Sequence, residues 1–346
     1  MTLGQQTAEL CQLYRAPGCC VLTDSVRKSG NRIRITAQLI DGATGNHVWA
    51  RRYDRDLEDI FAVQDEITET IVGAIEPEMA KTERERARAK RPGNLHSWDL
   101  FQRAMWHTYR RTNDDLEEAH RLFALAREAD PGLAPAYAGA EEACFFQTGG
   151  GFVDSAEETK ADAVRLARRA VELDSQDAFS RYALGRALTL VREHHAAIPE
   201  LEMAVDLNPS YAQAHYALGM ALGTSGRPED ALTPIETAMR LSPHDHYLGQ
   251  FMTHMAEALL FLGRHDEALD WARQSLRQPN IQWSRWAMLI SILGHTGEVN
   301  EARQSIDALA RIMPNSDIAF VRNYWPINHA PSMDYLIEGL AKAGMI

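Results

Sequence analysis

Long hydrophobic runs are missing from this 346-residue sequence. The apolar stretch at residues 287–290 is far shorter than the roughly 18 residues that a membrane-spanning helix requires, so we expect no such helix. The first residues lack the basic and apolar regions of a secretory signal. Cysteine is also scarce, because the four cysteines form no Cys-x-x-Cys pair and the adjacent Cys19 and Cys20 are poorly placed to bridge each other. These absences predict a reduced, cytoplasmic compartment.

Basic residues are outnumbered, since 36 Lys and Arg stand against 48 Asp and Glu, for a formal net charge of −12. This balance argues against a general nucleic-acid binder, which needs a net basic footprint. The net charge is +3 over residues 1–56, −3 over 57–91 and −12 over 92–346. The shift predicts a domain boundary at Pro92-Gly93. With 45% hydrophobic and 24% charged residues, the composition is that of a globular chain.

The front of the chain predicts three antiparallel strands. Residues 31–41 alternate between apolar and polar side chains, a period of two that is typical of a half-buried strand. Turn-forming residues follow at 41–46, and residues 47–53 resume as a strand. Another strand is expected from Cys20 to Val26, with a turn at Ser29-Gly30-Asn31.

A helix is expected after these strands, with Asp56 as its N-cap and apolar residues along one face from Ile60 to Ile75. Pro77 should end or kink it. Three strands and one helix give residues 1–91 a thin core, so we expect an incomplete α/β domain with an exposed sheet edge, through which a homo-oligomer could form. Residues 81–91 carry six basic and two acidic residues, and we favour a solvated helix end or linker over a docking site for an acidic partner.

Internal repeats dominate residues 92–316. Leu184-Gly185 recurs as Leu218-Gly219, and Pro209 recurs as Pro243, each 34 residues later. One longer step, which implies about ten inserted residues at and after 149–151, interrupts this spacing between the first two units. Six units follow from the pattern, at roughly 98–131, 134–175, 178–209, 212–243, 246–279 and 282–314.

This pattern resembles the tetratricopeptide repeat, in which two antiparallel helices cross at small residues and a proline precedes the next unit. Gly185 facing Ala197 permits a close helix approach, and prolines such as Pro209 fit helix starts. A last helix over 333–343, within a C-terminal segment 317–346, is expected to cap the stack. The expected fold class is therefore mainly α, with a tetratricopeptide-repeat α-solenoid in residues 92–316 preceded by the small α/β domain.

A second resemblance covers the front of the chain. Residues 24–41 (DSVRKSGNRIRITAQLID), 47–50 (HVWA) and 59–67 (DIFAVQDEI) are similar to the TolB/FlgO-type α/β domain. That domain precedes tetratricopeptide repeats in bacterial signalling proteins labelled adenylate or guanylate cyclases, or in winged-helix transcriptional regulators. The family's additional opening strand and helix are not recognised here, and Asp24 stands where a glycine is common. The resemblance implies the sensor-and-scaffold portion of such a protein.

Motifs that carry chemistry are few. The triple glycine 149–151 is not followed by Gly-Lys-Ser/Thr, which favours a flexible insertion over a phosphate-binding loop. The histidine groups 194–195 and 244–246 lack ligand partners at metal-site spacing, so we favour solvent-exposed turn residues over a zinc site. No G-x-S-x-G or H-E-x-x-H motif occurs, and no stretch is long enough for a cyclase domain. We therefore predict no enzyme, no cofactor and no metal site.

With no catalytic or metal site expected, the remaining candidate for function is a binding surface of the repeats. By analogy with tetratricopeptide arrays, the first helix of each unit lines a concave groove that binds an extended peptide or a helix. The alternative is that these residues pack against neighbouring helices. Only one of them is basic, so the Lys/Asn clamp that grips a C-terminal carboxylate is not reproduced, and an acidic terminal peptide is not expected. The candidate groove residues are Tyr182, Arg186, Gln213, Tyr216, Met220, Gln250, Thr253, Glu257 and Ser291.

Three hypotheses of function follow. The first is a non-catalytic protein-interaction scaffold of a bacterial signalling protein, which binds a protein or peptide in the concave groove. The second is the regulatory C-terminal portion of a class III adenylate or guanylate cyclase. The third is a fragment of a winged-helix transcriptional regulator. The domain that would decide between the last two would lie upstream of Met1, and the chain itself is expected to bind no nucleic acid.

Overall fold

The computed structural model describes residues 20–29, 32–41, 47–56, 96–151, 155–314 and 316–346. The chain divides into two compact units, Met1–Leu95 and His96–Ile346. The helix predicted from Ile60 to Ile75 and the basic segment 81–91 lie outside the described residues.

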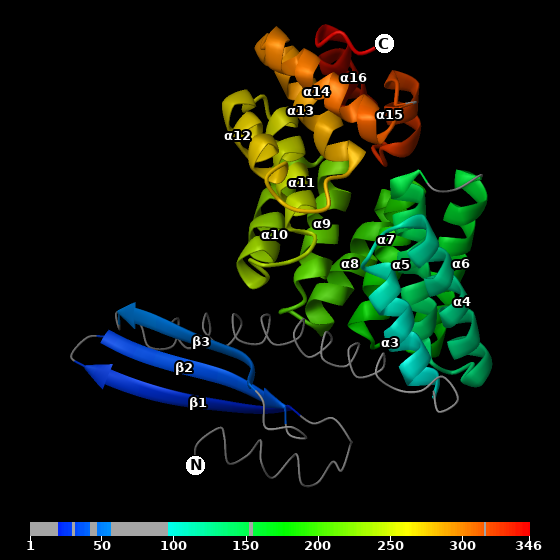
Figure 1. The fold of residues 1–346 in the computed structure, drawn as a ribbon, viewed down its shortest axis with the longest axis vertical. Coiled ribbons are helices and arrows are strands. Elements are labelled where there is room, and N and C mark those ends of the chain that lie inside the picture. Colours follow the sequence, from blue (N-terminus) through cyan, green and yellow to red (C-terminus); the bar gives the residue numbers. More distant parts are fainter. Residues whose placement is uncertain (1–19, 30–31, 42–46, 57–95, 152–154, 315) are drawn as a thin grey trace. The chain divides into compact units, whose positions relative to one another are not determined.

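The described part of the first unit is an antiparallel sheet in the order β1-β2-β3 (Figure 1). Ile35 in the middle strand pairs with Val26 on one side and with Tyr53 on the other. Leu39 is buried and Arg34, on the opposite face, is exposed, as the period of two predicts. The strands are β1 (Cys20–Ser29), β2 (Arg32–Asp41) and β3 (His47–Asp56).

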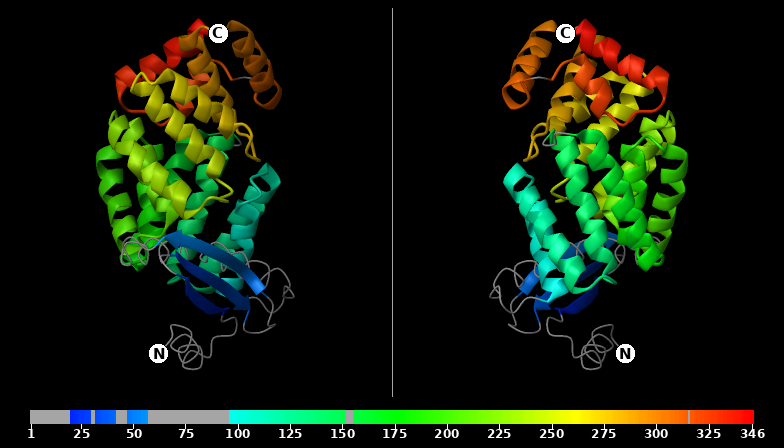
Figure 2. Two further views of the ribbon diagram at one scale, coloured as in Figure 1. Left: turned by 90° about the vertical axis from the view of Figure 1, so that its left-hand side faces the viewer. Right: turned by 90° about the vertical axis from the view of Figure 1, so that its right-hand side faces the viewer.

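The second unit consists of paired helices that follow one another along the chain (Figure 2). Six pairs occupy the described residues between 96 and 314, at the positions that the repeat spacing predicts. The first helix of each pair packs against the first helix of the next pair, as in an α-solenoid. The pairs are α3 (Ser97–Thr108) with α4 (Asn113–Ala129), α5 (Ala134–Gly150) with α6 (Ala156–Leu173), α7 (Ala178–Leu190) with α8 (His194–Leu207), α9 (Ala212–Thr224) with α10 (Pro228–Leu241), α11 (Leu248–Phe261) with α12 (His265–Ser275), and α13 (Trp283–Thr296) with α14 (Val299–Ile312).

Small residues let the two helices of a pair approach closely. A Cβ atom at Gly219 of α9 would lie 3.0 Å from the carbonyl oxygen of Ala231 and 2.5 Å from Cγ1 of Ile235, both on α10. The same crossing recurs at Gly185, where a Cβ atom would overlap Leu201 of α8. The glycines that mark the repeat in the sequence are therefore the points of closest helix contact.

The residues inserted in the second unit lengthen its two helices. Helices α5 and α6 have 17 and 18 residues, against 13 and 14 in α7 and α8. Gly149 and Gly150 form the last turn of α5, and Gly151 caps it at a left-handed φ of 70°. The predicted flexible insertion is therefore wrong for these two glycines.

The prolines that recur with the repeat lie in turns between units. Pro209 follows α8 and precedes α9 by three residues, and Pro243 lies between α10 and α11. The prediction that they begin helices is wrong, although Pro135, Pro228 and Pro331 do occupy the first turns of α5, α10 and α16 (Ala330–Lys342). Because proline lacks a backbone N–H, the repeated prolines suit the segments where one hairpin ends.

The C-terminal segment contains α15 (Ile318–Tyr324) and α16. The sequence predicted the second of these, at 333–343, but not the first. Helix α16 packs against α13 so closely that a Cβ atom at Gly294 would overlap the carbonyl oxygen of Gly339. The last hairpin thus has a covered face, as a terminal repeat requires.

Contacts within the second unit also join helix pairs that are far apart in the chain. The indole N–H of Trp283 in α13 donates to the carbonyl oxygen of Gly149 in α5, at 2.7 Å. The ring of Tyr109, just after α3, lies 4.5 Å from that of His246, just before α11. The array therefore curves until its second hairpin meets its sixth and its first meets its fifth.

Candidate functional site

The residues expected in the groove lie on the first helices of the third to sixth hairpins, α7, α9, α11 and α13. Eight of the nine are buried, and Gln213 is half-buried. Their neighbours are side chains and main chain of this same unit. The structure therefore shows what covers these side chains, whereas their role in binding a partner stays a prediction.

At α7, the candidate residues belong to a buried ionic network. The guanidinium of Arg186 donates to Glu141 at 2.5 Å, to Glu142 at 3.4 Å and to the hydroxyl of Tyr182 at 2.5 Å. It also lies 4.6 Å from the ring centre of Phe145. Burial raises the pKa of Glu141 to about 7, and the nearby Arg186 opposes that rise. This network joins the second and third hairpins, which is a packing role.

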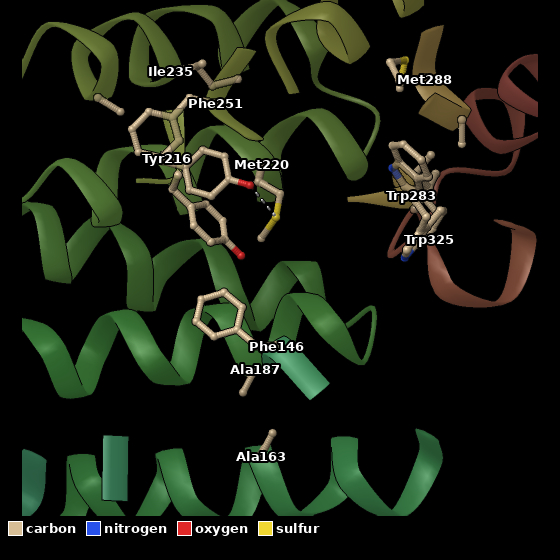
Figure 3. Close-up of a cluster of buried hydrophobic side chains, with 14 of the residues drawn as sticks. Phe146, Ala163, Ala187, Tyr216, Met220, Ile235, Phe251, Trp283, Met288 and Trp325 are labelled. Atoms are coloured by element: carbon tan, nitrogen blue, oxygen red, sulfur yellow. Dashed lines mark hydrogen bonds between the residues drawn. The ribbon is translucent and has the colours of Figure 1, made fainter. Parts of the chain in front are cut away.

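At α9, two candidates help to enclose a small cavity with an aromatic wall. Figure 3 shows these two, Tyr216 and Met220, in a cluster of buried side chains that also contains Phe251. The ring of Tyr216 stacks on Phe251 with ring centres 4.5 Å apart, and its hydroxyl faces the sulfur of Met220 at 3.9 Å. The cavity has a volume of about 70 Å³. Its aromatic lining residues are Phe145, Phe146, Tyr216, Tyr247, Trp283, Tyr324 and Trp325.

Polar candidates bridge neighbouring first helices. The amide of Gln250 in α11, which also lines the cavity, bonds Ser284 at 3.2 Å and accepts from Arg285 at 3.4 Å. Gln213 in α9 donates to the carboxylate of Asp245 at 3.0 Å. The hydroxyl of Thr253 bonds back to the carbonyl oxygen of Gly249 within α11. Tyr216, Met220 and Gln250 are therefore gathered at one cavity, whereas Gln213 and Thr253 are not part of its lining.

The last two candidates contact the C-terminal segment. The carboxylate of Glu257 accepts the indole N–H of Trp325 at 2.5 Å, and the hydroxyl of Ser291 donates to the carbonyl oxygen of Leu336 at 2.8 Å. Trp325 is 2% exposed and meets the ring of Trp283 edge-on at 5.6 Å. The inner wall at α11 and α13 is thus covered by the chain's own residues.

Two residues that matter at this wall were not found from the sequence. Trp325 lies in a segment that the repeat pattern does not reach, so no periodic signal marks it. Arg111 follows α3, and its guanidinium lies 4.1 Å from the ring centre of Tyr247 and 4.5 Å from that of Phe146. None of its three buried nitrogens has a hydrogen-bond partner among the described residues. Arg111 lies near these two rings because the array curves, and the sequence alone does not indicate that curvature.

The histidine groups are only partly as expected. His195 and His244 are exposed, but His194 is 1% exposed and its Nε2 bonds the hydroxyl of Thr224 at 2.8 Å. The prediction of an exposed turn residue is therefore wrong for His194, because α8 begins there and turns it inward. In the part of the chain that the structure describes, no three His, Cys, Asp or Glu residues are grouped so that they could hold a metal ion.

Two further observations concern the chemistry of the chain. Cys144 is a free, buried thiol whose pKa is raised to about 12, chiefly by burial, so it is not a reactive nucleophile. Over the described ranges, no helix combines the length and apolar character needed to cross a membrane.

Comparison with known proteins identifies one relative and several similar folds. No protein-family model matches the chain. Over 172 residues, half of this chain, it is 38% identical to a protein of Rhizobium meliloti (strain 1021) named "Putative adenylate cyclase 3". The match spans 29% of that protein's length.

Among solved structures, the Cut9–Hcn1 assembly of the APC/C is similar with a TM-score of 0.54 and 15% identity, over 72% of this chain and 42% of that one. The PilF protein of Pseudomonas aeruginosa has a TM-score of 0.45 and 19% identity, over 67% and 95% of the two chains. A tetratricopeptide-repeat protein of Thermus thermophilus has a TM-score of 0.42 and 20% identity, over 52% and 91%. At these identities the likeness concerns the fold alone. The six successive helical hairpins, with the likeness to the Cut9–Hcn1 assembly, make this fold a tetratricopeptide-type α-solenoid.

Proposed function

We propose that this chain is a non-catalytic protein-interaction scaffold of a bacterial signalling protein, and that it binds a partner peptide or helix along its inner wall. The observation that carries the proposal is the repeated helical hairpin, whose first helices present aromatic and amide side chains around one cavity. Aromatic side chains supply much of the binding energy at protein interfaces because each buries a large area. The proposal concerns Tyr216, Met220 and Gln250, which line that cavity.

A site-specific crosslinking experiment tests this proposal. A photoreactive amino acid replaces Gln213, which is half-buried on α9, or Glu236, which is exposed on α10 of the same hairpin. We expect the position-213 variant to crosslink a specific protein in cells of the source bacterium and the position-236 variant to crosslink it far less. Equal crosslinking at the two positions, or none at position 213, would contradict binding at the inner wall.

A second candidate, the regulatory portion of an adenylate or guanylate cyclase, is favoured by the Rhizobium meliloti relative. In this candidate the repeats bind a regulator while catalysis belongs to another domain or chain. We expect the purified chain to form no cyclic nucleotide from ATP or GTP. The genomic sequence upstream of the Met1 codon tests the parentage, since a cyclase frame there supports this candidate and a winged-helix frame supports a transcriptional regulator instead.

We also propose that residues 1–91 form part of a TolB/FlgO-type domain, that residues 92–316 form the repeat array, and that the protein works in the cytoplasm. An edge of the β1-β2-β3 sheet would allow pairing with a second copy. Light scattering on the purified chain tests this pairing, because a monomer at all concentrations would contradict it.

A further inference from the structure

The C-terminal segment leaves the last turn of α15 as an extended stretch, residues 325–329, that crosses the ends of α7 and α9. Arg192 lies two residues after the end of α7. Its guanidinium donates to the carbonyl oxygens of Arg322 at 2.6 Å, Asn323 at 3.3 Å and Trp325 at 3.0 Å. Asn328 makes two further hydrogen bonds. Its backbone N–H donates to the carbonyl oxygen of Thr224 at the end of α9, and its side-chain amide donates to the carbonyl oxygen of Arg192. Because Arg322 and Asn323 belong to the last turn of α15, two of the Arg192 bonds cap that helix, as basic side chains near helix ends do. The bonds at Trp325 and Asn328 hold extended main chain, as extended peptides are held on protein surfaces.

Between these two contacts, the stretch inserts an indole into the inner wall. Trp325 donates its N–H to Glu257 of α11 and packs edge-on against Trp283 of α13. Pro326 follows it at the rim of the aromatic cavity, and Ile327 is 2% exposed. The stretch therefore has the two parts of a bound peptide, a hydrogen-bonded backbone and a deeply buried anchor.

The anchor site selects its occupant chemically. The carboxylate of Glu257 is 1% exposed, so an occupant that lacks a donor at this point leaves a buried acceptor without its bond to Trp325. An acidic side chain would add repulsion to that loss. The aromatic walls favour a flat ring, and a proline after it fixes an extended backbone.

We propose that this wall is a recognition site for an extended protein segment with a tryptophan followed by a proline, and that residues 325–329 occupy it in cis. This inference rests on the proposed function and names the kind of partner. The partner's tryptophan takes the place of Trp325 against Glu257, and its carbonyl oxygen accepts from Arg192 as that of Trp325 does. The bonds of Arg192 to Arg322 and Asn323 lie at the exposed surface, where water can replace them when the cis segment leaves.

Occupation in cis lowers the affinity for a partner in a calculable way. A tethered segment has an effective concentration on the order of millimolar, and the apparent affinity for a competitor falls by the fraction of molecules whose site is open. Removing the cis anchor should therefore expose a site that is largely occupied in the wild-type chain.

The test uses a fluorescein-labelled peptide with the sequence of residues 322–329, RNYWPINH, and measures its fluorescence anisotropy with the full chain. We expect it to bind the Trp325→Ala chain at least about tenfold more tightly than the wild type, because the cis competitor is lost. A Trp271→Ala chain, which loses a tryptophan of α12 outside the site, serves as the matched control and should bind like the wild type. A peptide with alanine in place of its tryptophan should bind none of the three.

A second variant keeps the test decisive if Trp325→Ala lowers the folded fraction. Trp325→Leu retains an apolar filler but has no N–H for Glu257, and it should also bind the peptide more tightly than the wild type. Adding Glu257→Leu to either variant should return its affinity for the peptide to that of the wild type. Equal peptide affinity for wild type and both variants, or a gain that survives Glu257→Leu, would overturn the inference. The crosslinking result at position 213 is independent, so a crosslinked partner with no peptide gain contradicts this inference alone.

Discussion

The position of Arg186 within its repeat predicts the side of the helix on which it lies, but not the residues that it contacts. The repeat pattern assigned it to the inner side of α7, and that is the side from which it reaches Glu141 and Glu142 of the preceding hairpin. The pattern carries no information about what lies opposite. Because both carboxylates are buried with it, the residue serves packing between hairpins.

Removing this buried cation should be costly. We expect Arg186→Met to lower the free energy of unfolding by about 3–5 kcal/mol, because Glu141 loses its partner while it stays buried. Arg165→Met, which breaks an exposed pair with Asp162 on α6, should cost less than about 1 kcal/mol. Urea denaturation measures both. Adding Glu141→Gln to Arg186→Met should recover part of the loss, and equal losses for the two single variants would show that the buried pair is not stabilising.

Two histidines, the half-buried His120 and the buried His194, should make the stability depend on pH. Burial lowers the pKa of His120 and of His194 below the ordinary value of 6.5. Their contribution is therefore complete above pH 6.5 and is lost as the pH falls through 6.5, because the unfolded chain binds protons first. Glu141 acts in the opposite direction, since its pKa of about 7 makes the folded chain the stronger proton binder between pH 4.5 and 7.

Urea unfolding at pH 7.5, 6.5 and 5.5 checks these signs. We expect the His120→Gln/His194→Gln chain to lose less stability than the wild type as the pH is lowered across this range. The Glu141→Gln chain should instead lose more stability than the wild type as the pH is lowered. An unchanged profile in the histidine double variant would mean that the pKa values of these rings are the same in the folded and the unfolded chain.

At the scale of elements, the hairpins were predictable because their signals are local. Small residues at helix crossings recur every 34 residues, and Gly185 and Gly219 are the crossing points that the structure shows. The lengths of α5 and α6 were not predictable, because the spacing of 44 residues between the equivalent positions Ala119 and Ala163 is equally compatible with a loop or with longer helices. Helix α15 was missed since it belongs to no repeat.

The crossing glycines should not tolerate a methyl group. We expect Gly185→Ala to destabilise the protein by about 1–3 kcal/mol, because the added Cβ overlaps Leu201 and lies 3.1 Å from the carbonyl oxygen of Ala197. Gly149→Ala is the matched control, since it is also helical and a Cβ there meets nothing within 4 Å. That control should be neutral or stabilising by up to about 1 kcal/mol. Thermal and urea unfolding measure both, and equal effects would contradict close packing at the crossing.

At the scale of the second unit, the curvature of the array decides what the inner wall can do. The sequence predicted an open groove because a solenoid repeat contacts only its neighbours. Here Arg111 of the first hairpin reaches Tyr247 of the fifth, and Gly149 of the second bonds Trp283 of the sixth. Small rotations between successive hairpins add up to a curvature that brings these residues into contact. The sequence of a single repeat does not determine that total curvature. The same closure explains why most of the candidate residues are buried and why the cavity among them is small.

This closure should couple hairpins that an open solenoid leaves independent. In Trp283→Phe the bond to Gly149 is lost, at a cost of about 1 kcal/mol. We expect amide hydrogen exchange to accelerate in α5 by about fivefold as well as in α13, although four hairpin steps along the chain separate them. Trp286→Phe on the same helix leaves the bond to Gly149 in place and should leave exchange in α5 unchanged. If exchange accelerates only in α13 and its chain neighbours, the array behaves as an open solenoid. A partner could then reach the inner wall without first displacing the chain's own residues.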